Sequence, residues 1–141
     1  MKLEQMNGKE RGMNERKKAI VVDDDPDFLD QQKAVLEAMG FDVATAEGRA
    51  DAEEKIKESM PDLAVVNLMM EEKDGGFILA RTLKQANPAM VVLLVTAVTA
   101  ETGLKFDMES AGARRWIKAD AILTKPVRIE QLRQELARLM P

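Results

Sequence analysis

The chain contains neither cysteine nor histidine among its 141 residues. The lack of cysteine excludes disulfide bonds and thiolate metal sites. The lack of histidine removes the commonest general base and the commonest metal ligand of proteins. Chemistry in this protein must therefore depend on carboxylates, amides, hydroxyls and lysines.

Long apolar runs and a signal peptide are also missing. No stretch approaches the roughly 20 apolar residues that a membrane-spanning helix requires. The net charge of -4 argues against nucleic acid as a direct partner. These features predict a soluble, cytoplasmic protein that contacts neither a membrane nor nucleic acid.

The composition, 45% apolar and 33% charged, is that of one globular domain with a single core. Residues 1–18 are polar, basic and without periodicity, which predicts a disordered leader. Residues 19–141 are predicted to form the domain. Because the final helical pattern ends near the last residue, we expect no output domain behind it.

Short apolar runs alternate with segments of helical spacing along this domain. The runs predict five strands, at 19–22, 41–46, 63–66, 90–95 and 122–123. The spacing predicts helices at 26–39, 48–60, 77–86 and 129–139, and it is interrupted by two glycines in the segment 99–118. Such alternation is typical of a parallel α/β sheet with right-handed crossovers and helices on both faces.

Four of the predicted strands run into polar residues. Asp23, Asp24 and Asp25 follow the first strand, and Asn67 follows the third. Thr96 follows the fourth strand and Lys125 follows the fifth. In open parallel sheets, ligands bind at the carboxyl ends of the strands. We therefore expect carboxylates, an amide, a hydroxyl and an ammonium group to meet at one edge.

These residues lie in motifs that resemble the receiver domain of bacterial response regulators. The resemblance spans roughly residues 19 to 140. It implies a flavodoxin-like (βα)5 fold, a doubly wound parallel sheet with strand order 2-1-3-4-5. The motifs are Val-Val-Asp23-Asp24-Asp25-Pro, Pro-Asp-x4-Asn67, Val-Thr96-Ala97 and Leu-Thr-Lys125-Pro126.

The resemblance also implies a role for each residue of the expected pocket. In such receivers, an aspartate at the end of the third strand takes a phosphoryl group from a sensor histidine kinase or phosphotransfer protein. Asp23 and Asp24 are expected to hold Mg2+ together with the backbone carbonyl of Met69. Lys125 is expected to pair with the phosphoryl group, and Thr96 to form a hydrogen bond with one of its oxygens.

Asn67 stands at the position of the phosphoacceptor and changes this chemistry. A carboxylate is a nucleophile for phosphorus and a charged metal ligand, whereas a carboxamide is neutral and forms no acyl phosphate. We therefore expect no phosphorylation at residue 67 and only weak Mg2+ binding. An Asn in an otherwise complete pocket fits a natural replacement as well as an introduced Asp→Asn change.

Three further features depart from the family's pattern. Glu71 replaces a usual proline, which predicts a different shape for the loop after the third strand. Ile122 replaces a common aromatic residue that couples to the threonine, so that relay is in doubt. The stretch between Thr96 and Lys125 is longer than usual. The peptide bond between Lys125 and Pro126 is commonly cis in the family.

The resemblance implies a signalling protein rather than an enzyme, acting through protein–protein contacts. The expected contact surface consists of Thr99–Lys118, the fifth strand and the last helix. Within it, Arg114, Arg115, Trp116 and Ile117 are residues of types favoured at interfaces. The surface is expected to dock a downstream protein or a second copy of the chain.

Three other interpretations compete with the receiver. A haloacid-dehalogenase-like phosphatase could use Asp23 and Asp25 as its Asp-x-Asp motif, but it also needs a late acidic pair, and only Asp120 lies near the fifth strand. An FMN-binding flavodoxin is disfavoured because three aspartates would repel the phosphate. A pseudo-receiver scaffold that never used the pocket is less economical, because most pocket residues remain.

Overall fold

The computed structural model describes residues 17–68, 75–96 and 119–140. Five parallel strands form one sheet in the order β2-β1-β3-β4-β5, which confirms the predicted topology. The strands are β1 (Lys18–Val22), β2 (Asp42–Ala46), β3 (Leu63–Asn67), β4 (Val91–Thr96) and β5 (Ala121–Thr124). β1 and β5 each begin one residue earlier than predicted, which moves Lys18 out of the expected leader.

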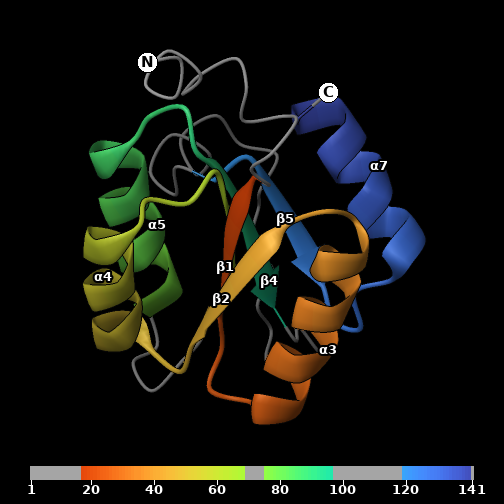
Figure 1. The fold of residues 1–141 in the computed structure, drawn as a ribbon, viewed down its shortest axis with the longest axis horizontal. Helices are drawn as coiled ribbons and strands as arrows, with labels where there is room; N and C mark the ends of the chain where they lie inside the picture. The colour runs from red at the N-terminus through yellow and green to blue at the C-terminus, as the bar shows by residue number, and fades with distance from the viewer. Residues whose placement is uncertain (1–16, 69–74, 97–118, 141) are drawn as a thin grey trace, which may run out of the picture.

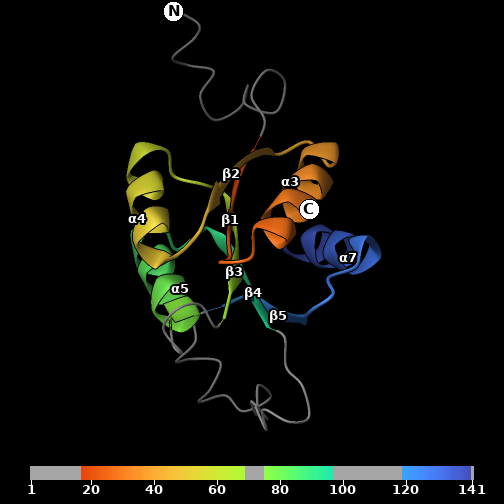
Figure 2. The same ribbon diagram turned by 90° about the horizontal axis from the view of Figure 1, so that it is seen from below.

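Helices cover both faces of the sheet (Figures 1 and 2). On one face lie α3 (Pro26–Ala38) and α7 (Ile129–Leu139), and on the other lie α4 (Arg49–Glu58) and α5 (Gly75–Ala86). The four helices correspond to the four predicted helical segments. The predicted helical spacing within 99–118 lies outside the described residues.

The core is divided by the sheet into two apolar layers. The α3 and α7 side includes Phe28, Leu36 and Leu132, packed on Val21 and Leu93. Successive side chains of a strand point to opposite faces. The strand residues buried on the α4 and α5 side, such as Ile20 and Val92, therefore alternate along each strand with those buried on the α3 and α7 side. All five residues of β3 are buried, as the unbroken apolar run predicts for a central parallel strand.

Local sequence explains where α3 begins and ends. The Asp25 side chain accepts a hydrogen bond from Asp27 N (3.0 Å), and Pro26 occupies the first turn. At the other end, Gly40 has a φ of 101°, which glycine adopts without steric penalty. The helix starts at residue 26 as predicted, and Gly40 directly follows its C-cap, Met39.

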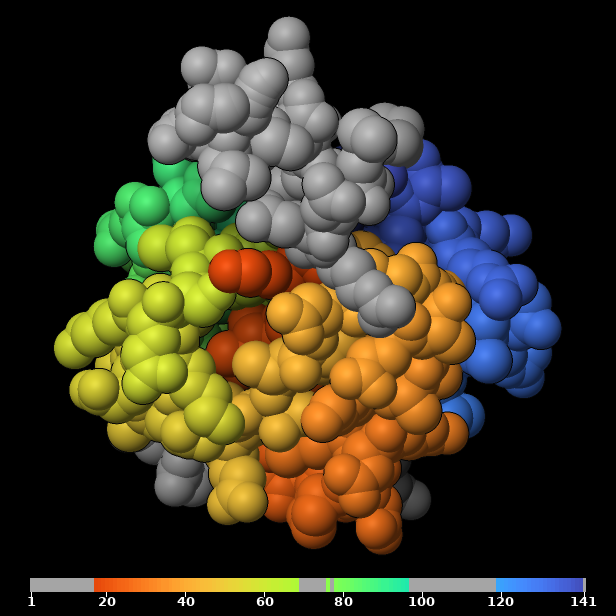
Figure 3. All heavy atoms as spheres, viewed as in Figure 1, coloured from red at the N-terminus to blue at the C-terminus, as the bar shows by residue number. Residues whose placement is uncertain are grey.

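β2 forms one border of the sheet, beside β1. A groove of about 290 Å3 lies near the starts of β1 and β2 and includes Lys18, Asp42 and Lys55. Figure 3 shows the beginning of β1, in red, at the surface between the yellow-green and orange segments. No described helix of the chain is long and apolar enough to cross a membrane.

Candidate functional site at the carboxyl edge of the sheet

Asp23 is the centre of a polar cluster at the carboxyl edge. It directly follows β1 and is fully buried, with 0% of its surface exposed. Its Oδ1 accepts hydrogen bonds from Asp25 N (2.9 Å) and from Asn67 Nδ2 (3.2 Å). Its Oδ2 forms an ion pair with Lys125 Nζ at 2.9 Å. The structure thus brings together three elements, β1, β3 and the chain after β5.

Burial is the dominant influence on the Asp23 carboxyl group. Removal from water disfavours the charged form and raises the pKa of Asp23 above its usual range. The Lys125 ammonium and the Asp25 N–H oppose this shift, because each stabilises the carboxylate. The net effect is a raised pKa for the Asp23 carboxyl group, which marks Asp23 as a candidate functional residue.

Lys125 lies between Asp23 and an aromatic ring. Its Nζ is 4.3 Å from the centroid of the Phe28 ring, within the range of a cation–π contact. Its side chain is 22% exposed, so the ammonium group is partly screened from solvent. The sequence marked Phe28 only as part of the apolar face of α3. Its spacing gave no sign that the ring would lie beside this lysine.

The Lys125–Pro126 peptide bond is cis, as the resemblance led us to expect. Lys125 N also donates a hydrogen bond to Thr96 O (2.9 Å), which joins the end of β4 to the chain that leaves β5. Lys125 and Thr96 are therefore neighbours through the backbone, and Lys125 and Asp23 are neighbours through their side chains.

Thr96 is the last residue of β4 and is almost fully buried, with 2% exposed. Its Oγ1 has no hydrogen-bond partner within the described residues. A buried hydroxyl without a partner costs free energy, on the order of 1–3 kcal/mol. Such a group is a candidate donor or acceptor for a ligand at this edge.

The remaining predicted site residues differ in their surroundings. Asp24 is exposed, next to the buried Asp23. Asp25 is occupied as the N-cap of α3, which explains its place in the acidic run. Met69 and Glu71 lie outside the described residues. Ile122 is half-buried and packs on the α4 and α5 side of the core.

The donors at this edge fit a divalent cation such as Mg2+, but weakly. Two adjacent carboxylates, Asp23 and Asp24, and the Asn67 amide supply the oxygen atoms that Mg2+ prefers. However, Asn67 directs its Nδ2 toward Asp23, and its amide would have to turn over to present its oxygen to an ion that Asp23 holds. Residues 17–68, 75–96 and 119–140 contain no cluster of three or more acidic, histidine or cysteine side chains suited to a metal.

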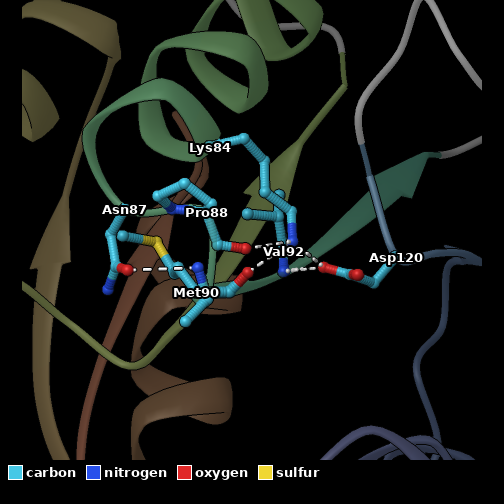
Figure 4. A network of polar contacts seen from close by, with 7 residues as sticks. Lys84, Asn87, Pro88, Met90, Val92 and Asp120 are labelled. Carbon is cyan, nitrogen blue, oxygen red and sulfur yellow. Dashed lines mark hydrogen bonds and ion pairs between the residues drawn. The ribbon is translucent and has the colours of Figure 1, made fainter.

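Asp120 lies at the opposite, amino end of the sheet (Figure 4). Its Oδ2 accepts a hydrogen bond from Val92 N (2.7 Å) and pairs with Lys84 Nζ at 2.9 Å. Lys84 Nζ also donates to Met90 O (2.6 Å). Asp120 precedes β5, whereas Asp23 follows β1, so the two carboxylates cannot share a metal ion.

This placement contradicts the haloacid-dehalogenase-like alternative. That interpretation needs a late acidic group beside the Asp-x-Asp motif, and Asp120 was its only candidate. Asp25, the second aspartate of that motif, caps α3 instead of facing a shared site. The structure therefore does not support the phosphatase hypothesis.

Together, the sheet order and the polar cluster define a flavodoxin-like α/β domain with a site at the carboxyl ends of its strands. The family model of the response regulator receiver domain matches residues 19–137. The chain belongs to this family. Receiver domains are generally signalling modules rather than enzymes, typically bind Mg2+ at this site, and interact with histidine kinases or phosphotransfer proteins.

Several curated proteins are similar to the chain. It is 31% identical over 124 residues to the transcriptional regulatory protein ZraR of Salmonella typhimurium, covering 86% of the chain and 26% of that protein. It is 28% identical to the transcriptional regulatory protein PhoP of Escherichia coli O157:H7, covering 87% of the chain and 52% of that protein. The chain thus spans about a quarter to a half of these relatives.

Solved structures show the same fold. A CheY-like response regulator receiver domain protein from Methanospirillum hungatei has a TM-score of 0.72 at 25% identity, with 87% of this chain and 92% of that one covered. A response regulator protein from Burkholderia pseudomallei, with a phosphorylated aspartic acid, calcium ion and citrate, has a TM-score of 0.68 at 23% identity, with 85% and 66% covered.

Proposed function

We propose that this chain is a receiver module of two-component signalling in which residue 67 takes the place of the phosphoacceptor and accepts no phosphoryl group. The supporting observation is the position of Asn67, at the end of β3 and hydrogen-bonded to the buried Asp23. An aspartate here would present a nucleophilic carboxylate beside Lys125, whereas the amide nitrogen of Asn67 donates to Asp23 instead.

In this proposal, Asp23, Lys125 and Thr96 supply the groups that a phosphoryl-binding site needs. The Lys125 ammonium would neutralise charge on a phosphoryl oxygen, and the Thr96 hydroxyl would supply a hydrogen bond to it. Asp23 and Asp24 would hold Mg2+ weakly, joined by the Asn67 amide oxygen and the Met69 carbonyl. When bound, that ion offsets negative charge on phosphoryl oxygens.

The decisive experiment restores the carboxylate. The native chain and the Asn67→Asp variant are incubated with acetyl phosphate and Mg2+, and intact mass is measured. We expect a hydroxylamine-labile phosphoryl adduct on the variant and none on the native chain. Asn87→Asp is a matched control, because it creates an aspartate at the amino end of the sheet, and it should give no adduct.

An adduct at residue 67 of the native chain would contradict the proposal. So would an Asn67→Asp variant that folds and binds Mg2+ but gains no adduct. Peptide mapping of the adduct separates modification of residue 67 from modification of Asp23 or Asp24.

For the output, we propose contact with a protein partner or a second copy through β5, α7 and residues 99–118. Within the described part, Ile129 is a large apolar residue with 44% of its surface exposed on α7. A cleft of about 560 Å3 at the start of α7 is bordered by Lys125, Arg128 and Gln131. Trp116, with its neighbours Arg114, Arg115 and Ile117, lies outside the described residues.

This surface is tested by Trp116→Ala, read out by sedimentation velocity and by binding to a cognate histidine kinase. We expect weaker self-association or kinase binding with unchanged circular dichroism. Met60→Ala is the control, because Met60 is an exposed apolar residue (41%, against 44% for Ile129) that follows α4 on the other side of the sheet. Loss of the fold in Trp116→Ala would show that Trp116 belongs to the core.

A further inference from the structure

Gly76, in the first turn of α5, lies directly against the backbone of residues 67 and 68. A Cβ atom at position 76 would be 2.4 Å from Asn67 O, 2.5 Å from Leu68 Cα and 2.6 Å from Leu68 O. Real carbon contacts of this kind are well above 3 Å, and all three atoms belong to the main chain. Therefore no side-chain rotation could relieve the clash, and with any other residue the backbone of either α5 or the end of β3 would have to move.

The peptide after Asn67 is held from two sides. Leu68 N donates a hydrogen bond to Val95 O (2.7 Å) on β4, and Leu68 O accepts one from Gly76 N (3.0 Å) on α5. The strand end thus has a fixed partner in the sheet and a fixed partner in the helix. Its displacement would break at least one of these bonds in a buried place, which is costly.

The rest of α5 is fixed as well. Leu79, Ala80 and Leu83 are fully buried against the sheet. Lys84 is tied by its ammonium group to Asp120 and to the Met90 carbonyl. Because the helix is held along its length, a methyl group at position 76 would be accommodated mainly by displacement of the strand end that carries residue 67.

We propose that Gly76 is a positioning residue: it sets the distance between residue 67 and Asp23 and couples the first turn of α5 to any change at residue 67. This inference rests on the proposed function in one respect, that residue 67 is the acceptor position. It adds a route from the pocket to a helix that involves neither Thr96 nor the missing aromatic residue at position 122.

The first test is Gly76→Ala in the native chain, read out by NMR. The side-chain NH2 of Asn67, bonded to Asp23, should lose protection from hydrogen exchange and shift its resonances. Gln85→Ala, an exposed change on the same helix, is the control and should leave these resonances in place. If Gly76→Ala folds and keeps the native Asn67 signals, the inference is wrong.

The second test places Gly76→Ala in the Asn67→Asp background. Displacement of a reacting group by a fraction of an ångström is expected to slow phosphorylation by acetyl phosphate about tenfold or more. The rate is measured under conditions where both variants are fully folded by circular dichroism. A purely structural role would lower stability and leave this rate unchanged.

A third measurement covers the case in which Gly76→Ala does not fold. Asn67→Ala should shift the backbone amide of Gly76 and the first turn of α5, while the amide of Asp120 at the far end of the sheet stays unchanged. Unshifted Gly76 signals would overturn the coupling. Failure of Asn67→Asp to accept phosphate would overturn the proposed function, but the two NMR tests of Gly76 would still decide this inference.

Discussion

Two lysine–aspartate pairs of equal length lie at opposite ends of the sheet. Lys125 and Asp23 are 2.9 Å apart at the carboxyl end, and Lys84 and Asp120 are 2.9 Å apart at the amino end. The Asp23 carboxylate is completely buried, whereas 26% of the Asp120 side chain is exposed. The same contact therefore has two different surroundings.

The surroundings decide what each pair does. At the amino end, the pair connects α5, the start of β4 and the start of β5 through main-chain partners (Figure 4). At the carboxyl end, the Asp23 carboxyl group has a raised pKa, and nearby Thr96 Oγ1 lacks a partner within the described residues. Distance alone does not distinguish a structural ion pair from a functional one, whereas burial and unmatched polar groups do.

The largest expected effect concerns the amino-end pair. Asp120→Asn keeps an oxygen for Val92 N but leaves the partly buried Lys84 ammonium without its counter-charge. We expect a loss of about 1.5–2 kcal/mol in the free energy of unfolding. Urea unfolding measures it as a lower midpoint at constant slope.

Asp23→Asn is the matched change at the other end and should behave differently. It leaves Lys125 without its counter-charge, but it also removes a charge whose burial keeps the pKa of Asp23 raised even with Lys125 beside it. An amide oxygen can still accept from Asp25 N. We therefore expect a change of less than about 1 kcal/mol, in the stabilising direction. Equal destabilisation by the two substitutions would remove the distinction between the two pairs.

The next prediction tests whether the carboxyl end of the sheet is a metal site. Asn67→Asp adds a third carboxylate beside Asp23 and Asp24, so we expect Mg2+ to bind about tenfold more tightly, which corresponds to about 1.4 kcal/mol. Isothermal titration calorimetry of both forms gives the ratio. Equal affinities would indicate that residue 67 does not face the metal, and Asp120→Asn should leave Mg2+ binding unchanged.

The smallest effect is the pH dependence of stability that Asp23 contributes. Because the pKa of Asp23 is raised in the folded state, the folded chain keeps the Asp23 proton to a higher pH than the unfolded chain does. The contribution of Asp23 to stability is therefore present below the usual aspartate pKa of about 3.9 and is lost as the pH rises through the higher folded pKa.

The stability difference between Asp23→Asn and the native chain isolates this term from the other carboxylates. It should increase with pH, in favour of the variant, across the interval between the unfolded and folded pKa of Asp23. Urea unfolding at several pH values measures it. A difference that does not vary with pH would mean that burial leaves the titration of Asp23 unaltered.

Much of the site could be predicted because it depends on local patterns at strand ends. The run that ends at Asn67 and the acidic run after β1 are each readable from a few neighbouring residues. Once parallel topology is accepted, their strand ends must lie at one edge. The expected gathering of carboxylates, an amide and an ammonium group followed from that edge, whereas the particular contacts of Asp23 with Asn67 and Lys125 are seen only in the structure.

Other features depend on how distant segments pack. Phe28 was recognisable as part of an apolar helix face, but its ring reaches Lys125 only because α3 covers the strand that Asp23 follows. Gln32 lies in the same helix, and its buried Oε1 has no partner among the residues described, which spacing cannot reveal. Asp120 looked like a possible metal ligand until the sheet placed it at the amino end.

By itself, the sequence determined the five-strand alternation, the family, and the amide at position 67, because these depend on residue identity and short-range periodicity. Only the tertiary structure decided that Asp23 is wholly buried, that Gly76 lies against the peptide of Asn67, and that Lys84 pairs with Asp120 at the amino end of the sheet. The physical reason is that burial and contact depend on which elements pack together, and residues far apart in the chain meet only through the sheet and its helices.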